Sequence, residues 1–472
     1  MLSATCSLAA CAPDLGPRPQ VRALDTLQSS SSIPASGTNR DWPEQRWWTS
    51  YGDRQLDQLV DVALQDSPDL ATALARVRQA RGALEASRSS LLPTLNGQGS
   101  AEVAKQSYNA GTPAAALPKG WKDYGTLALS ANWNLDVWGK NRALLAAATS
   151  ATDAAVAELR QSEMILAAEV VSSYFDLARL VERQKVLEEA VDARDGSASL
   201  TRQRMEQGLE NEGPLRQANS ETARARMLVA ANSEQIDVRR HALAALLGAG
   251  PDRTKDLVPA PIETIAETPV PANAGIALTG RRPDVVAARK LVEAMDNGVD
   301  YAQKSFLPDI SLGGLLGLTS LGLGNLFDSG SDYGNAGAAI SLPIFQGGAL
   351  SGRYRIARAG YDSQVASYNK TVITALQEVA DAVASRKSAE QQELYAGEAR
   401  DEAKRAYDLA LQRYNAGLST YIVVLDAQTR ELDARLSALD AHFATLTSEV
   451  ALKRALGGGY ADDMNEKATS DE

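Results

Sequence analysis

Cys6 and Cys11 are the two cysteines of this 472-residue chain, and both lie at its extreme N-terminus. The body of the chain can therefore form neither a disulfide framework nor a cysteine-based metal site. A thiol can also be acylated, and the stretch Leu-Ala-Ala-Cys at 8–11 looks like a bacterial lipobox, whose cysteine becomes the lipidated first residue. Cys11 is accordingly the predicted lipidation site, although residues 1–10 lack the basic residues of an ordinary signal peptide. Two incidental thiols in a leader are the alternative.

Catalytic chemistry is not indicated elsewhere in the sequence. The motifs H-E-x-x-H, G-x-x-x-x-G-K-[ST] and G-x-S-x-G are absent, and the two histidines, His241 and His442, lie far apart in helical stretches. We therefore expect no enzyme, no catalytic residue, no metal site and no cofactor other than a covalent lipid on Cys11. The net charge of −11 argues against nucleic acid as a partner, because its phosphates would be repelled.

The chain repeats itself over a long distance. Residues 67–93 match residues 282–308, since both segments carry a Pro-Asp pair near the start and a Leu-Pro pair at the end. Residues 202–209 match residues 411–418 at a shift of 209 (417 − 208 = 209). A period this long indicates the tandem duplication of a whole subdomain rather than a solenoid.

Each half has the same predicted order of elements. A helix ends at a Leu-Pro pair, where Pro93 or Pro308 removes a backbone donor and clashes with the preceding turn. A β-hairpin follows, and then comes a very long helix, a turn with glycine and a return helix. The first long stretch, 141–207, contains no proline and a single glycine, so a continuous helix there would span on the order of 100 Å. A long antiparallel coiled coil is the alternative that the helices alone leave open.

The predicted strands alternate apolar and polar residues with a period of two. Each is about 10 residues long, which is the length of a tilted strand that crosses a bilayer. Soluble sheets that are buried on one side alternate in the same way, so the alternation alone does not identify membrane strands. Because the pattern occurs in two duplicated pairs, in a chain that also has a lipobox, it favours a sheet that crosses the membrane. The apolar residues of the clearest strand are Leu127, Leu129, Ala131, Trp133, Leu135 and Val137.

Four strands are too few to close a barrel, for which about eight is the working minimum. Open sheet edges are not tolerated in lipid. The chain is therefore expected to oligomerise, and these arguments allow two, three or more copies.

The predicted organisation has six parts. In order, they are a signal and lipobox leader at 1–11, a flexible tether at 12–40, a first repeat at 41–248, an equatorial linker at 249–280, a second repeat at 281–457 and a polar C-terminal tail at 458–472. The first repeat contains a β-hairpin at about 94–137 and a long helix pair at about 139–248. The second repeat contains a β-hairpin at about 309–345 and a long helix pair at about 346–457.

The sequence resembles the outer membrane efflux protein family, which contains TolC. It is most similar to the lipoprotein subgroup that serves resistance–nodulation–division pumps, the NodT/OprM-like branch. The resemblance covers nearly the whole chain from about residue 40 to 458. It is carried by the segments 47–60, 67–93, 135–142, 342–353 and 413–428.

This resemblance implies an internally duplicated α+β membrane protein of trimeric channel type. Three chains, with four strands each, would form a 12-stranded transmembrane β-barrel that continues into a long periplasmic α-helical barrel. An equatorial belt would come from residues near 40–60, 249–280 and 458–472. The implied location is the outer membrane of a Gram-negative bacterium, with a lipid anchor and a large periplasmic part.

The resemblance also implies two functional regions. The turns at Gly208, Leu209, Gly417 and Leu418 would be the periplasmic tips that dock an adaptor protein. Ile422, Asp426 and Arg430, spaced by four residues on one helix face, would form the closed periplasmic aperture. The alternative for Asp426 is a solvated carboxylate near the start of a helix, where the helix dipole favours it.

The implied function is that of an exit duct of a tripartite efflux pump, which conducts small toxic compounds passively to the exterior. Its partners would be two further copies of the chain, a periplasmic adaptor protein, an inner-membrane resistance–nodulation–division transporter and outer-membrane lipid. A duct for type I protein secretion is the first alternative. A periplasmic coiled-coil scaffold without a pore is the second.

Overall fold

The computed structural model describes residues 12–22, 27, 29–38, 42–109, 111, 113–260 and 269–462. Cys11 lies outside the described residues, as does most of the tail predicted at 458–472. The chain divides into two compact units. The first contains residues 1–21, 76–155 and 288–368, and the second contains residues 22–75, 156–287 and 369–472.

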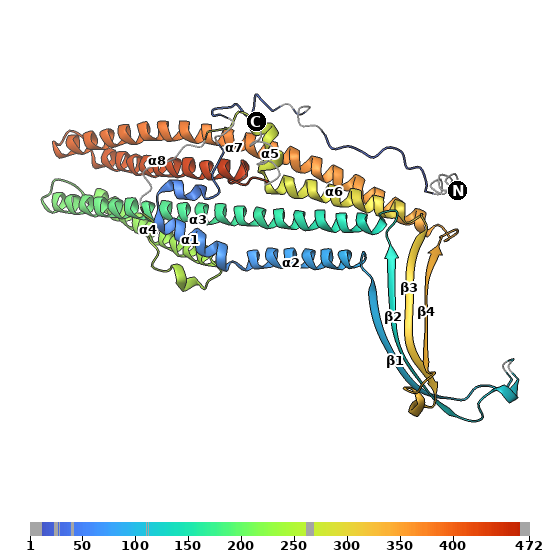
Figure 1. The fold of residues 1–472 in the computed structure, drawn as a ribbon. Helices are drawn as coiled ribbons and strands as arrows, with labels where there is room; N and C mark the ends of the chain where they lie inside the picture. The colour runs from blue at the N-terminus through green and yellow to red at the C-terminus, as the bar shows by residue number, and fades with distance from the viewer. Residues whose placement is uncertain are drawn as a thin grey trace. The chain divides into compact units, whose positions relative to one another are not determined.

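The order of elements repeats in the two halves of the chain, as Figure 1 shows. A helix, two strands, a long helix and a return helix follow one another twice. The long helices α3 and α7 have 67 residues each, and the return helices α4 and α8 have 35 residues each. The elements are η3 (Trp47–Tyr51), α1 (Arg54–Asp66), α2 (Pro68–Ser89), β1 (Thr94–Ala104), η4 (Ala114–Ala116), β2 (Lys122–Leu135), α3 (Lys140–Glu206), α4 (Glu212–Leu246), η5 (Pro251–Thr254), α5 (Ala274–Arg281), α6 (Pro283–Lys304), β3 (Asp309–Leu321), η6 (Leu323–Asn325), β4 (Asp332–Ser341), α7 (Ala349–Asn415) and α8 (Tyr421–Ala455).

No helix among the described residues is both long enough and apolar enough to cross a membrane.

The four strands lie side by side in one curved antiparallel sheet of the first unit, in the order β1-β2-β3-β4 (Figure 1). Directly opposed residues of antiparallel strands project to the same face. The register therefore collects most of the large apolar residues of the four strands on one face, where Leu129 and Leu316 are exposed in the isolated chain. The opposed pairs that make up this face include Leu95–Ala131, Leu127–Leu318, Leu129–Leu316, Trp133–Leu312, Leu312–Ala338 and Ile310–Ile340.

The opposite face of the sheet is mainly polar. Its opposed pairs include Thr94–Asn132, Asn96–Ser130, Ser100–Thr126, Thr126–Thr319 and Asn134–Ser311. The predicted alternation of the strands is thus confirmed by their register. Strands β1 and β4 have a neighbour on one side only, so the sheet of a single chain has two open edges.

Indole N–H groups and one ion pair hold the junctions between helices and strands in this unit. Trp133 donates to the carbonyl of Leu91, just before Pro93, at 3.0 Å. Trp138 donates to the carbonyl of Pro308 at 2.8 Å. Lys140, at the start of α3, binds both carboxylate oxygens of Asp309 at 2.6 and 2.7 Å. Each junction is therefore pinned from the neighbouring strand or helix, and the two prolines mark where helix changes to strand.

Part of the segment that we predicted to be a flexible tether is held against the protein. Arg18 binds Asp296 and also Asp300, at 2.7 Å, on α6. The carbonyl groups of residues 16 and 17 accept hydrogen bonds from Arg358, and that of Pro19 accepts one from Tyr361 at 3.0 Å. These contacts connect residues 16–19 to α6 and α7, within the segment 12–40 that the sequence predicts to be a flexible tether.

The core of the second unit packs η3 and α1 against α3 and α8. Its aromatic residues are stacked edge to face, with Tyr51 and Phe175 at 5.0 Å between ring centroids. Lys453 is buried beside them, donates to Ser50 at 3.0 Å and lies 4.4 Å from the ring centroid of Tyr51. Burial lowers the pKa of Lys453, and the charge of nearby Glu449 opposes this shift. The first residues of the body and the last helix are thereby joined in one core.

Candidate functional site

The two tips predicted from the sequence have the same backbone geometry. At each tip the long helix ends in a glycine with φ of 73°, Gly208 or Gly417. This left-handed conformation costs a glycine little, because it has no Cβ. The next residue donates its N–H to a carbonyl five positions back, Leu209 to Arg204 at 2.9 Å and Leu418 to Arg413 at 2.8 Å. This is the Schellman motif, which satisfies carbonyl groups at the end of the helix.

The leucines that follow the glycines point away from the protein. Leu209 is 63% exposed and Leu418 is 71% exposed. The two exposed leucines therefore occupy equivalent positions on equivalent turns. Each tip thus presents one leucine on a rigid, capped turn.

A cluster of three side chains, which we call the tip clasp, joins the two tips of one chain. It consists of Arg204 and Glu210 from the first tip and Tyr414 from the second. The hydroxyl of Tyr414 donates to Oε1 of Glu210 at 2.8 Å, and Nε of Arg204 lies 3.3 Å from the same oxygen. The guanidinium of Arg204 also lies 4.7 Å from the ring centroid of Tyr414, which is a cation–π contact. The clasp ties two turns that are 204 residues apart in sequence.

Tyr414 is only 1% exposed, and its ring packs on Tyr421 at the start of α8, with 5.5 Å between centroids. Burial and the hydrogen bond to Glu210 raise the pKa of Tyr414 to about 12. The phenol therefore stays protonated and keeps its donor role at any physiological pH.

The three predicted aperture residues share one exposed face of α8, which we call the aperture face. Nε of Arg430 lies 3.1 Å from Oδ2 of Asp426, and both side chains are largely exposed. Ile422 is 60% exposed beside them. The structure thus brings Asp426 and Arg430 together. Helix α8 begins at Tyr421, and Asp426 lies beyond its first turn.

Sequence reasoning missed the tip clasp as a unit. Its signal lay in the comparison of the two halves, since at the shift of 209 Met205 is the counterpart of Tyr414 and Ser419 is the counterpart of Glu210. The halves therefore differ at the two positions that hold the clasp together. The contact between Tyr414 and Glu210 therefore has no equivalent between their counterparts Met205 and Ser419.

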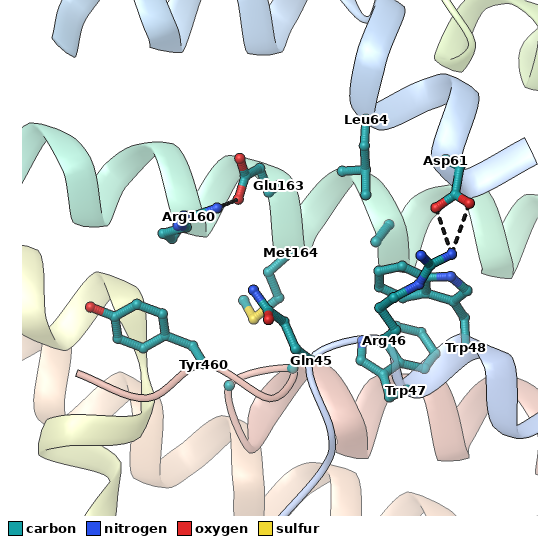
Figure 2. Close-up of a pocket in the computed structure, with 13 residues that line it drawn as sticks. Gln45, Arg46, Trp47, Trp48, Asp61, Leu64, Arg160, Glu163, Met164 and Tyr460 are labelled. Carbon is teal, nitrogen blue, oxygen red and sulfur yellow. Dashed lines mark hydrogen bonds and ion pairs between the residues drawn. The ribbon is translucent and has the colours of Figure 1, made fainter. Parts of the chain in front are cut away.

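A pocket of the second unit, shown in Figure 2, has a volume of about 350 Å³. It lies between η3, α1, α3 and the segment after α8. Its charged groups are already paired, because Arg46 binds both oxygens of Asp61 at 2.8 Å and Arg160 binds Glu163 at 2.7 Å. The guanidinium of Arg46 also lies over the ring of Trp48. The pocket therefore has no cluster of convergent polar groups that would recognise a ligand.

Within the described residues, no group of three His, Cys, Asp or Glu side chains is placed to hold a metal ion. The groups of interest are instead a two-faced sheet, a clasped pair of tips and an exposed aperture face. The clasp and the aperture face each contain an ion pair, Arg204 with Glu210 and Arg430 with Asp426.

Both halves of the chain match the model of one protein family, described as "Outer membrane efflux protein", over residues 59–249 and 277–458. These two segments make up more than half of the chain. The chain belongs to the outer membrane efflux protein family, which is the family that its sequence resembles. Two matches to one model, in order, also agree with the internal duplication.

Named relatives and solved structures support this assignment. The multidrug resistance outer membrane protein MdtQ of Escherichia coli O6:H1 is 31% identical over 390 residues, which cover 79% of this chain and 80% of the relative. The fusaric acid resistance protein FusA of Burkholderia cepacia is 32% identical over 368 residues, which cover 76% and 69%. The crystal structure of the outer membrane protein VceC from Vibrio cholerae matches with a TM-score of 0.83 and 37% identity, over 89% of this chain and 100% of VceC.

These likenesses confirm the fold class that the sequence predicts. The chain is an α+β membrane protein of the trimeric channel class, which combines a β-barrel with a helical barrel. The family is one of outer-membrane efflux proteins rather than of enzymes.

Proposed function

We propose that this chain is the outer-membrane exit duct of a tripartite efflux pump and that it conducts small toxic compounds passively from the pump to the exterior. The relatives named for multidrug resistance and for fusaric acid resistance support this substrate class. In this proposal an inner-membrane transporter of the resistance–nodulation–division class supplies the energy.

The observation that carries the proposal is the two-faced sheet with open edges. An apolar face suits lipid and a polar face suits a water-filled lumen. The unpaired backbone groups on the edges of β1 and β4 would each cost several kcal/mol in lipid, so other copies must pair with them. Three copies of a four-stranded sheet make a closed barrel of twelve strands, above the minimum of about eight.

The tips are the proposed docking surface for a periplasmic adaptor protein. Leu209 and Leu418 offer exposed apolar groups on backbone turns that the Schellman motif makes rigid. The repetition of this turn in both halves would present six similar leucines in a trimer, which suits a ring of adaptor chains.

The aperture face is the proposed constriction at the periplasmic end. Three copies of Asp426 that approach one axis would repel one another, and Arg430 at 3.1 Å supplies the countercharge in each chain. Ile422 would add an apolar plug beside this ring. The tip clasp would then hold the two helix pairs of each chain, α3 with α4 and α7 with α8, together at their tips while the duct is closed.

Cys11 is the proposed lipid anchor in the outer membrane. Arg18 is seven residues further on and binds two aspartates of α6. Residues 12–17 would therefore be a short linker between the lipidated cysteine and the folded protein. Replacement of Cys11 by Ser should abolish incorporation of a radiolabelled acyl chain and leave the oligomer largely intact, because the barrel itself holds the membrane. Persistent label would show that another group carries the lipid.

Two other functions make different predictions. A duct for type I protein secretion would co-purify with a peptide-exporting transporter, and its deletion would leave drug sensitivity unchanged. A coiled-coil scaffold without a pore would let the Cys11→Ser variant leave the membrane without detergent. The apolar sheet face argues against the scaffold, since it would then lie exposed to water.

The test of the proposal combines channel recording with complementation. Purified oligomer should form ion-conducting pores in planar bilayers, and expression in a strain that lacks its own exit duct should restore resistance to small drugs. Affinity purification from cross-linked cells should recover an adaptor and an inner-membrane transporter. Absence of both conductance and complementation would refute the proposal.

A further inference from the structure

A recess of about 430 Å³, which we call the α3 recess, lies among α3, α4 and α8 of the second unit. From α3 it is lined by Glu169, Ser173 and Asp176, which are spaced by four and three residues and so share one face of that helix. None of these three belongs to the core in which α3 packs against η3 and α1. The return helices α4 and α8, which run alongside α3 (Figure 1), form the two walls. The α3 recess is therefore built by one chain, on a face of α3 that the core leaves open.

One end of the α3 recess is held together by ion pairs. Nη2 of Arg239 on α4 lies 3.2 Å from Oδ2 of Asp176 on α3. Nε of Arg179 lies 3.9 Å from the other oxygen of the same carboxylate. The charges at this end are thus satisfied within the chain, and they fix α4 against α3.

Two further charged side chains line the α3 recess, and both are exposed. They are Glu169 on α3 and Arg454 on α8. Within the part of the chain that the structure describes, neither has an ion pair or a side-chain hydrogen bond. A carboxylate and a guanidinium are therefore both available to a molecule that enters.

The direction of the helices places these two side chains at the same level. Glu189 and Arg179 of α3 bind Arg435 and Asp440 of α8, so the two helices run antiparallel. Continuation of this pairing brings position 169 of α3 opposite the last turn of α8, which holds position 454. The available charges of opposite sign thus lie near the same end of the α3 recess.

The middle of the α3 recess is mainly apolar. Ala242 and Leu246 line it from α4, and Val450 and Ala451 line it from α8. Ser173 is 5% exposed, and its hydroxyl has no hydrogen-bond partner among the described residues. Buried hydroxyls are usually paired, so this one favours a polar group or a water molecule beside it. A concave apolar surface with a few polar groups is the usual form of a small-molecule site.

We propose that the α3 recess binds small amphoteric molecules, which carry a carboxylate, an ammonium group and an apolar body. The carboxylate pairs with Arg454, whose planar fork of donors suits it, and the ammonium group pairs with Glu169. The apolar body lies between the walls of α4 and α8. The charged residues of the lining are two acids and two arginines, so a molecule with both charges suits it better than a pure anion or a pure cation. This site is separate from the tips and the aperture face, and the inference goes beyond the proposed function.

Three related fluorescent compounds test this charge requirement. Nε-dansyl-lysine carries both charges at neutral pH and an aromatic body. Its methyl ester keeps only the ammonium group, and its Nα-acetyl derivative keeps only the carboxylate. Fluorescence anisotropy with the purified oligomer in lipid nanodiscs would give the three dissociation constants. The amphoteric compound should bind about tenfold more tightly than either derivative, because each derivative lacks one charge-assisted contact.

Substitutions in the lining identify the partner of each charge. Arg454→Gln should remove the preference over the methyl ester, and Glu169→Gln should remove the preference over the acetyl derivative. Ala242→Trp fills the α3 recess from an exposed position, so the oligomer should form while binding is lost. Arg224→Gln, at another exposed site of α4, is the matched control and should bind as the wild type does.

Equal affinities for the three compounds would overturn this inference, as would unchanged preferences in both glutamine variants or full binding in Ala242→Trp. None of these results would touch the proposed function, which conductance and complementation measure separately. Conversely, a chain that shows the predicted preferences but neither conductance nor complementation would support the site and refute the proposed function.

Discussion

The hydroxyl of Tyr414 lies 2.8 Å from Oε1 of Glu210 and joins the tips of the two helical hairpins of one chain. Arg204 lies against both partners, so the contact combines a charge-assisted hydrogen bond with a cation–π contact. The clasp therefore resists separation of the two tips, which the proposed opening of the duct would require.

Loss of this hydrogen bond should loosen the tips. Tyr414→Phe removes one donor per chain, worth about 1 kcal/mol, and leaves the ring in place. On the scale of 1.4 kcal/mol for a tenfold change, about 1 kcal/mol shifts the balance between closed and parted tips roughly fivefold in each chain. Larger single-channel conductance in planar bilayers is the expected result. Tyr407→Phe is the matched control, since Tyr407 is a half-buried neighbour in the same apolar cluster.

The aperture face yields a second prediction. Asp426→Ala removes the partner of Arg430, and Ile422→Ser removes the apolar group beside it. Both variants should raise conductance and sensitise cells to large antibiotics such as vancomycin. Arg405→Ala breaks the exposed ion pair with Glu402 elsewhere on a helix and serves as the control. Wild-type conductance and vancomycin sensitivity in the double variant would move the constriction to another part of the chain.

The orientation of the sheet can be tested with one substitution on each face. Leu129 lies on the apolar face opposite Leu316, and Asn132 lies on the polar face opposite Thr94. A carboxylate in lipid costs on the order of 2 kcal/mol at mid-bilayer, whereas one in a water-filled lumen stays hydrated. Leu129→Asp should therefore reduce the yield of membrane-inserted protein much more than Asn132→Asp. Equal yields would contradict the assignment of the two faces.

The tips should be needed for docking but not for folding. Leu209→Asp and Leu418→Asp alter side chains that are largely exposed, so the oligomer should form normally while efflux in a complementation assay falls. Gly417→Trp should have the same effect with a larger structural cost, because a residue with a side chain at φ of 73° is strained by about 1–2 kcal/mol. Val258→Asp, at an exposed site of the linker, is the control. Full efflux in both leucine variants would place the adaptor elsewhere.

Much of this architecture could be read from local patterns in the sequence. Pro93 and Pro308 end helices wherever they occur, and the period-two alternation around Leu129 specifies a strand with one apolar face. The repeated segments revealed the duplication, and Gly208 and Gly417 marked the turns because glycine is the residue that adopts a left-handed conformation at little cost. Each of these signals acts within a few residues of chain, so no knowledge of the fold is required to interpret it.

Other features could be decided only by the tertiary structure. The anchorage of residues 16–19 by Arg358 and Tyr361 depends on side chains more than 300 residues away in sequence. Tyr414 binds Glu210, rather than solvent or a neighbour on its own helix, because of how the helix pairs α3–α4 and α7–α8 pack against each other.

The physical reason is the range of the forces involved. The sequence determined the helices, strands, turns and repeats, since backbone sterics and hydrophobic periodicity act locally along the chain. Hydrogen bonds and ion pairs act only across a few ångströms, so their partners are determined once packing has brought distant segments together. The tip clasp and the anchored N-terminal segment therefore belong to the folded protein alone.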